Sequence, residues 1–292
     1  LEMLFGIVRF VIDTISPDDP NDDALATLPR GAERVDVSLC VGSLTRHLTI
    51  SSKFPFTASR RDAWSIWMPV PDETEYPGFS SDHDVQSDRR DLNRLCRQPD
   101  GPKLLYFPTD RAVTFPATRF KGPGNRSDDL EVAYRYRAPE EWLQSIEAIL
   151  YNARWRDLNA KERGKAGGGY FAAYEATMLR FFGDTKRFMW DDDGVLYVQT
   201  RDGTLHSLDE LSSGEKQVLL FGAELHRRWT PGSLILLDEP ELHLHDAWLA
   251  KLWGFLGELQ RERGGQVIIA TQSNYLFGLG EPGSRVILGR AP

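Results

Sequence analysis

Two short, continuous runs of apolar residues lie in the last third of the chain. The first occupies 234–237 after the turn pair Pro231-Gly232, and the second occupies 266–271 after Gly264-Gly265. Runs of this kind are typical of strands buried on both faces of a parallel sheet. Between them, apolar residues recur at helical spacing over 248–259. The pattern predicts a strand, a helix and a strand joined by a right-handed crossover.

Other patterns predict further helices and strands. Apolar residues over 218–225 give one broad helical face, and residues 139–182 are mostly helix formers with two amphipathic segments. The remaining patterns predict an antiparallel hairpin at 35–50, loops or short helices at 71–103, a short strand at 103–107, a strand pair at 194–200 and 204–207, and an apolar helix at 1–12. Together these elements indicate an α/β fold.

Composition narrows the class of protein. The 292 residues are 41% hydrophobic and 27% charged, which is typical of soluble globular chains with a sizeable core. The net charge of -8 argues against a uniformly basic nucleic-acid binder, although a local basic patch stays open. Only Cys40 and Cys96 are present, which suits a reducing cytoplasm and excludes a cysteine zinc cluster. No apolar run approaches the roughly 18 residues that span a bilayer, so we expect a cytoplasmic protein with no membrane segment.

Two carboxylates follow the first apolar run directly. Asp238 and Glu239 stand at the carboxyl end of the predicted strand, where open α/β sheets bind their ligands. Adjacent acids at that point suit a cation such as Mg²⁺, which prefers oxygen ligands. The alternative is that Asp238-Glu239-Pro240 is only a polar turn. His243 and His245 also alternate in a way that could ligate a metal.

The segment Ser212-Ser213-Gly214-Glu215 has two interpretations. It matches the capping box that opens many ordinary helices, in which Ser and Glu satisfy each other's backbone N–H groups. A helix start made of small residues is also a site for anions, because free N–H groups point outward there. We expect a bulky residue at Ser212 or Gly214 to block anion docking without preventing folding.

These motifs resemble the second half of an ABC-type ATPase. Leu211-Ser-Ser-Gly-Glu215 is similar to the ABC signature, with Ser213 in place of glycine and Glu215 in place of glutamine, and 238–245 resembles the Walker B motif and D-loop of the RecF, SMC and OLD-like branch. The resemblance is tight over 209–276. It implies an ABC-ATPase-like P-loop NTPase core with an antiparallel β-subdomain and a short helical insert.

The resemblance also implies roles for individual residues. Ser212, Ser213, Gly214 and Glu215 would contact the γ-phosphate of ATP on the opposite protomer, and His245 of the D-loop would join that nucleotide site. Asp238 would hold Mg²⁺ and Glu239 would be the general base. Gln272 replaces the family's switch histidine. Arg111 ends a Pro-Thr-Asp-Arg sequence similar to one in OLD-like relatives, so it would face nucleotide or partner, or else pair with Asp110 or another surface acid.

One expected motif does not occur. The sequence holds no Gly-x-x-x-x-Gly-Lys-Ser/Thr, whereas 1–12 resembles the helix that follows this loop in the family. We expect a chain cut just downstream of its phosphate-binding loop, the alternative being a pseudo-ATPase. The glycines at 167–169 predict a flexible turn and not a substitute loop. The expected parts are an N-terminal lobe at 1–60, a variable insert at 61–184 and a C-terminal lobe at 185–292.

The functional expectation is a nucleotide-dependent switch. The resemblance implies ATP binding and hydrolysis with Mg²⁺ in a homodimer formed around ATP, in bacterial anti-phage defence with a separate nuclease or toxin effector. The alternatives are a RecF-like DNA-repair ATPase that clamps DNA and a non-hydrolysing scaffold. The basic residues over 154–165 are a candidate phosphate contact or a solvated face. The helical segment sustains no heptad repeat, which argues against a chromosome-tethering machine.

Overall fold

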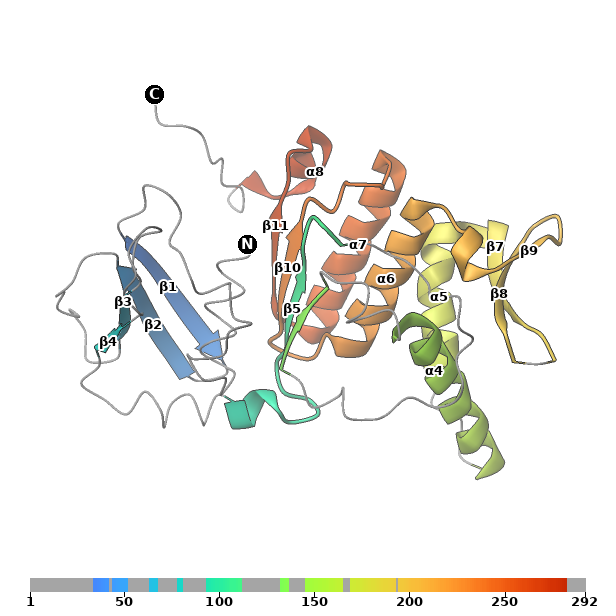
Figure 1. Cartoon of the computed structure of the whole chain (residues 1–292), viewed down its shortest axis with the longest axis horizontal. Coiled ribbons are helices and arrows are strands. Elements are labelled where there is room, and N and C mark those ends of the chain that lie inside the picture. Colours follow the sequence, from blue (N-terminus) through green and yellow to red (C-terminus); the bar gives the residue numbers. More distant parts are fainter. Residues whose placement is uncertain are drawn as a thin grey trace.

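The computed structural model describes residues 34–41, 44–51, 63–67, 78–80, 93–111, 132–136, 145–164, 169–192 and 194–282. Within these residues the fold is mixed α/β, as expected, with a four-stranded parallel sheet and two further sheets (Figure 1). The predicted helix at 1–12 and most of the glycine turn at 165–168 lie outside the described residues. No helix in the described part of the chain is long and apolar enough to cross a membrane.

The parallel sheet has the strand order β11-β10-β5-β6. Its strands are β5 (Leu104–Phe107), β6 (Ala133–Arg135), β10 (Leu234–Asp238) and β11 (Gln266–Ala270). The central strands β5 and β10 are buried almost throughout, which is why their sequences are continuous apolar runs. The strands predicted at 103–107, 234–237 and 266–271 are therefore confirmed, with small shifts at their ends.

Helices α6 (Ser213–Arg228) and α7 (Asp246–Arg263) pack beside the parallel sheet, and α4 (Ser145–Glu162) and α5 (Tyr170–Phe182) lie beyond them (Figure 1). The short α8 (Asn274–Leu279) follows β11. Leu219, Leu220 and Phe221 of α6 are fully buried and join the same core as Leu105, Phe107 and Leu237 of the strands. Within the described residues, the helices predicted over 218–225, 248–259 and 139–182 are confirmed as α6, α7 and the pair α4 and α5.

The other two sheets depart in part from expectation. The predicted hairpin forms from β1 (Arg34–Val41) and β2 (Leu44–Ser51), but its sheet continues with β3 (Ala63–Trp67) parallel to β2 and with β4 (Gly78–Ser80). This sheet is thus mixed, and β4 falls where only loops or short helices were expected. The third sheet joins β7 (Lys186–Trp190), which the sequence did not predict, to the expected pair β8 (Leu196–Thr200) and β9 (Leu205–His206).

Candidate functional site at the carboxyl edge of the parallel sheet

The ends of β10 and β11 bring Glu239 and Gln272 together. The two strands are adjacent and parallel, with Asp238 opposite Ala270, so the residues that follow them leave the sheet at the same edge. The Gln272 amide Nε2 donates a hydrogen bond of 2.5 Å to Glu239 Oε1. Two candidate residues that lie 33 positions apart in the sequence therefore meet directly in the structure.

The backbone at Glu239 is held in an unusual conformation. Its φ of 43° lies in the left-handed region, which residues other than glycine rarely adopt. Three bonds fix it: the Glu239 N–H donates to Ala270 O at 2.8 Å, and the carbonyls of Asp238 and Glu239 accept from Arg111 Nη1 and Nη2 at 2.7 and 2.9 Å. These hydrogen bonds therefore fix the position of the backbone from which the Glu239 side chain extends.

Arg111 holds this turn in place by donating hydrogen bonds to its backbone carbonyls. It is only 4% exposed, and its Nε donates to Gln217 Oε1 of α6 at 2.9 Å while Gln217 Nε2 donates back to the Arg111 carbonyl at 3.3 Å. Burial lowers the Arg111 pKa to about 10, against the opposite effect of Asp238, so the guanidinium stays charged at neutral pH. Of the two alternatives for this residue, pairing with Asp110 or another surface acid is wrong, because the side chain is buried and donates to Gln217 and to carbonyls of its own chain. The alternative that it faces nucleotide or a partner stays a prediction.

Glu241 was not singled out from the sequence, yet its carboxylate accepts more hydrogen bonds at this edge than the carboxylate of Glu239 does. Its Oε1 accepts from Thr271 Oγ1 at 2.7 Å, from Gln272 N at 2.9 Å and from Ser273 N at 3.1 Å. Its Oε2 is buried and has no hydrogen-bond partner among the described residues. An acid two positions after Glu239 is the only signal in the sequence, and its partners lie 30 residues away.

Asp238 ends β10 and is half-buried. Among the described residues its carboxylate accepts no hydrogen bond, which leaves its oxygens available to a cation. The described part of the chain holds no group of three or more His, Cys, Asp or Glu residues placed to bind a metal by themselves, so His243 and His245 form no such site there. Mg²⁺ usually keeps several waters and takes one or two protein carboxylates plus phosphate oxygens. Asp238 fits that mode of binding, in which the nucleotide supplies the other oxygens.

The start of α6 is a capping box, as the sequence predicted. Ser212 Oγ accepts from Glu215 N at 3.4 Å, and Glu215 Oε2 accepts from Ser212 N at 2.9 Å. Glu215 also forms an ion pair with Lys186 of β7. Burial raises the Glu215 pKa, but the hydrogen bonds from Lys186 and Ser212 outweigh it and hold the pKa below its usual value. Ser212 and Ser213 are exposed, so this helix start is open to a ligand.

Gly214 is different from its two neighbours because it is buried. A Cβ at this position would lie 2.6 Å from the carbonyl oxygen of His243 and 3.4 Å from the Trp248 ring. A side chain here would force the 240–245 turn to shift, because the start of α6 packs directly on its backbone, so a bulky residue at Gly214 would cost stability. The expectation of intact folding stays a prediction for the exposed Ser212. His245 is exposed at the N-cap position of α7, with its ring 5.1 Å from that of Trp248.

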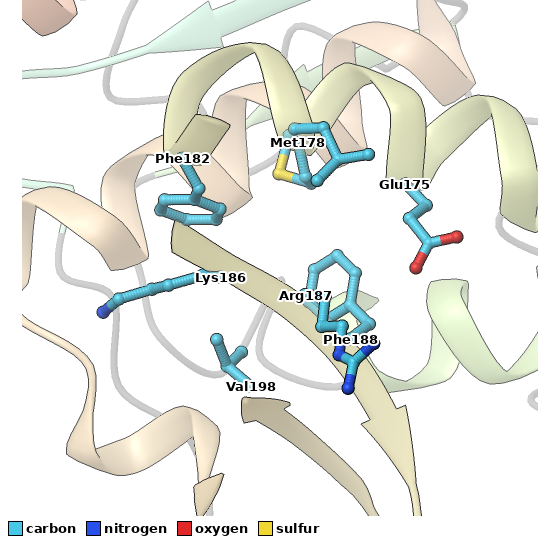
Figure 2. Close-up of a pocket in the computed structure, with 8 residues that line it drawn as sticks. Glu175, Met178, Phe182, Lys186, Arg187, Phe188 and Val198 are labelled. Atoms are coloured by element: carbon cyan, nitrogen blue, oxygen red, sulfur yellow. The ribbon is translucent and has the colours of Figure 1, made fainter. Parts of the chain in front are cut away.

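A small apolar hollow lies elsewhere, between α5 and the β7–β8 sheet. Figure 2 shows Met178, Phe182, Phe188 and Val198 around it, together with the charged side chains of Glu175, Lys186 and Arg187. None of the candidate site residues lines this hollow. Its one link to them is Lys186, which reaches Glu215 at the start of α6.

Part of the chain matches a known protein family. Residues 169–278 match the family described as "AAA domain, putative AbiEii toxin, Type IV TA system". This segment contains α6, β10, α7 and β11, and with them every candidate site residue predicted above except Arg111 and the basic residues over 154–165. No curated protein matches the chain.

Solved structures give a weaker likeness. The SMC head domain from Thermotoga maritima is 19% identical with a TM-score of 0.29, over 46% of this chain and 43% of that one. The Smc head domain with a coiled coil and joint derived from Pyrococcus yayanosii is 19% identical with a TM-score of 0.30, over 40% of this chain and 25% of that one. The chain thus spans less than half the length of either, and at these TM-scores the likeness carries no argument about function.

Proposed function

We propose that this protein is a Mg²⁺-dependent ATPase that acts as a nucleotide-driven dimeric switch. The observation that carries the proposal is the hydrogen bond between Gln272 and Glu239 at the carboxyl edge of the parallel sheet. The match of residues 169–278 to an AAA domain supports nucleotide hydrolysis by the same segment. Both residues follow the carboxyl ends of adjacent parallel strands, which is where open α/β sheets bind their ligands.

Glu239 would act as the general base in hydrolysis. Phosphoryl transfer depends on positioning and on neutralising charge more than on covalent help from the protein. The Glu239 carboxylate would orient the attacking water and accept its proton, while the Gln272 amide holds Oε1 in place. Gln272 can supply hydrogen bonds but no charge, which favours slow turnover. Asp238 would hold Mg²⁺ through its water shell, and the ion would supply neutralisation of phosphate charge.

The start of α6 would bind the γ-phosphate of ATP held by a second copy of the chain. The exposed Ser212 and Ser213 stand at a helix N-terminus, where backbone N–H groups favour anions. The negative charge of the Glu215 carboxylate would repel a phosphate, but the ion pair with Lys186 offsets that charge. The ion pair accounts for how glutamate can stand where the ABC signature has glutamine. Homodimerisation around ATP is therefore part of the proposal.

The biological setting we propose is bacterial defence in the cytoplasm, with a separate nuclease or toxin effector. The description of the matching family names a toxin and a toxin–antitoxin system, which supports this setting. The three-part division at 1–60, 61–184 and 185–292 stays a prediction. An effector that co-purifies with the protein would favour this setting, whereas ATP-dependent and salt-sensitive DNA binding would favour a DNA-clamping role.

The test compares ATP turnover and ATP binding in the full-length gene product. Glu239→Gln should lower single-turnover hydrolysis by roughly 10²- to 10⁴-fold, because an amide cannot accept the proton, and it should keep ATP binding. Glu258→Gln, on the exposed face of α7, is the matched control and should behave as the wild type. Hydrolysis by Glu239→Gln at the wild-type rate would refute the catalytic assignment and favour a non-hydrolysing scaffold.

A further inference from the structure

One side chain, that of Glu241, accepts several hydrogen bonds from the loop at 271–273 that carries Gln272. β11 ends at Ala270, and β10 turns away from it after Asp238 because Glu239 adopts a left-handed backbone. The ladder between the two strands therefore stops, and the N–H groups of Gln272 and Ser273 need other acceptors. Glu241 Oε1 accepts from both, at 2.9 and 3.1 Å, and also from the Thr271 hydroxyl at 2.7 Å. The Ser273 N–H is shared with Thr271 Oγ1, at 2.9 Å, so the Gln272 N–H is the group that depends on Glu241.

We propose that Glu241 is a positioning residue that sets Gln272 against Glu239. Hydrogen bonds to a carboxylate are roughly twice as strong as those between neutral groups, and three of them converge here on one oxygen. With the Gln272 backbone fixed, its side-chain amide reaches Glu239 Oε1. The two acids are thus complementary: Glu239 meets the side chain of Gln272, and Glu241 holds the backbone behind it. This role rests on the proposed ATPase function.

Glu241 itself is placed by the turn that follows Glu239. Leu242 N donates to Glu239 O at 3.1 Å and Leu244 N donates to Glu241 O at 3.0 Å, so 239–244 is a series of tight turns. Leu244 is buried in the core beneath it. The turn also carries His243, whose carbonyl packs on Gly214. A shift at the start of α6 would therefore reach Gln272 through Glu241.

The glutamine variant is a matched control for this role. In Glu241→Gln one amide oxygen can still accept from the 271–273 loop, and the amide nitrogen can lie where Oε2 lies, an atom without a partner among the described residues. Glu241→Ala removes all three bonds. A structural role for the charge alone would affect both variants alike, whereas a positioning role predicts that glutamine restores most of the activity.

The first readout is kinetic and uses the full-length protein. Glu241→Ala should lower single-turnover hydrolysis by roughly 10- to 100-fold with little change in ATP affinity, and Glu241→Gln should recover most of that loss. Because Glu241 acts through Gln272, the Glu241→Ala/Gln272→Ala double variant should be no slower than Gln272→Ala alone. Multiplied losses in the double variant, or an unchanged rate in folded Glu241→Ala, would overturn the proposal.

The second readout does not require turnover. Hydrogen exchange should be faster at the Gln272 amide in Glu241→Ala and nearer to the wild type in Glu241→Gln, because that N–H donates to Glu241. Unchanged exchange at the Gln272 amide in Glu241→Ala would also overturn the proposal. Failure of the ATPase function itself would be seen separately, as wild-type turnover by Glu239→Gln or as no turnover by the wild type. In that case the positioning role falls with the function on which it rests.

Discussion

The two ends of α6 are held in opposite ways. At its start, Ser212 and Glu215 satisfy each other within one turn, and Ser212 and Ser213 are exposed. Near its end, Glu224 is fully buried and accepts from Tyr136 Oη at 2.5 Å and from Arg228 Nε at 2.6 Å. The end that we propose binds a phosphate is closed by local hydrogen bonds, whereas the other end is held by a buried charge network.

Breaking the anchored end should have the largest effect on stability. Glu224→Ala leaves Arg228 buried without its carboxylate, which should lower the free energy of unfolding by about 3–5 kcal/mol. Urea denaturation of this variant beside Glu258→Ala measures the difference. Glu258 pairs with Arg180 on an exposed surface, so its loss should cost under about 1 kcal/mol. Equal losses would show that the Glu224 network does not anchor α6.

Gly214 should show the next largest effect, because it is the buried contact at the open end. Gly214→Ala places a methyl group 2.6 Å from the His243 carbonyl, so the 240–245 turn must shift, at a cost of about 1–3 kcal/mol. Gly254→Ala in α7 is the control, since a Cβ there meets nothing within 4 Å. It should stabilise the protein by about 0.5–1 kcal/mol. The two changes should therefore shift the melting temperature in opposite directions.

Removing the cap at Ser212 should have a smaller effect. Ser212→Ala loses the acceptor for Glu215 N and should cost about 1 kcal/mol of stability. Ser213→Arg should have little effect on folding because the position is exposed, but it should block ATP-driven dimerisation. Sedimentation with ATP tests this, and an undiminished dimer in Ser213→Arg would contradict phosphate docking at this end.

The smallest effect should be the pH dependence of the Glu215 contacts. The folded pKa of Glu215 lies below the ordinary value of about 4.3. Its contribution to stability is therefore complete above about pH 4.3 and is lost as the pH falls through the folded pKa. The gap in unfolding free energy between wild type and Glu215→Gln should be under about 1 kcal/mol at pH 7 and should narrow below pH 4.3. A gap that widens with acid would show that the carboxylate is not held ionised.

The same contrast explains what the sequence could predict. The capping box, the α6 and α7 helices and the β10 and β11 strands depend on neighbours within a few residues, and they were found from spacing alone. Register then placed Glu239 near Gln272, because adjacent parallel strands end at one edge. Glu224 was not singled out from the sequence: Arg228 lies only four positions away, but such a pair is typical of an exposed helix face, and the partner Tyr136 lies 88 positions away.

Missed elements have physical causes of the same kind. The strand β7, Lys186–Trp190, has two basic residues in a five-residue run, and pairing with β8 decides its conformation. For Arg111 the alternative of a surface ion pair was wrong, because a charged residue after a strand predicts exposure unless its buried acceptors are known. Those acceptors are the carbonyls of Asp238 and Glu239, which belong to another strand end. Because every residue carries a backbone carbonyl, the sequence does not show which carbonyls accept hydrogen bonds from Arg111.

The left-handed backbone at Glu239 lowers the stability of the folded chain, because a residue other than glycine is strained in that conformation. An L-residue in that conformation gives up roughly 1 kcal/mol that glycine would not. Glu239→Gly is therefore the change that selection for stability alone would favour at this turn, and it would delete the carboxylate that Gln272 holds. Under the proposed function, position 239 would be a point of trade-off between stability and activity, where a glutamate stands in a conformation that suits glycine better.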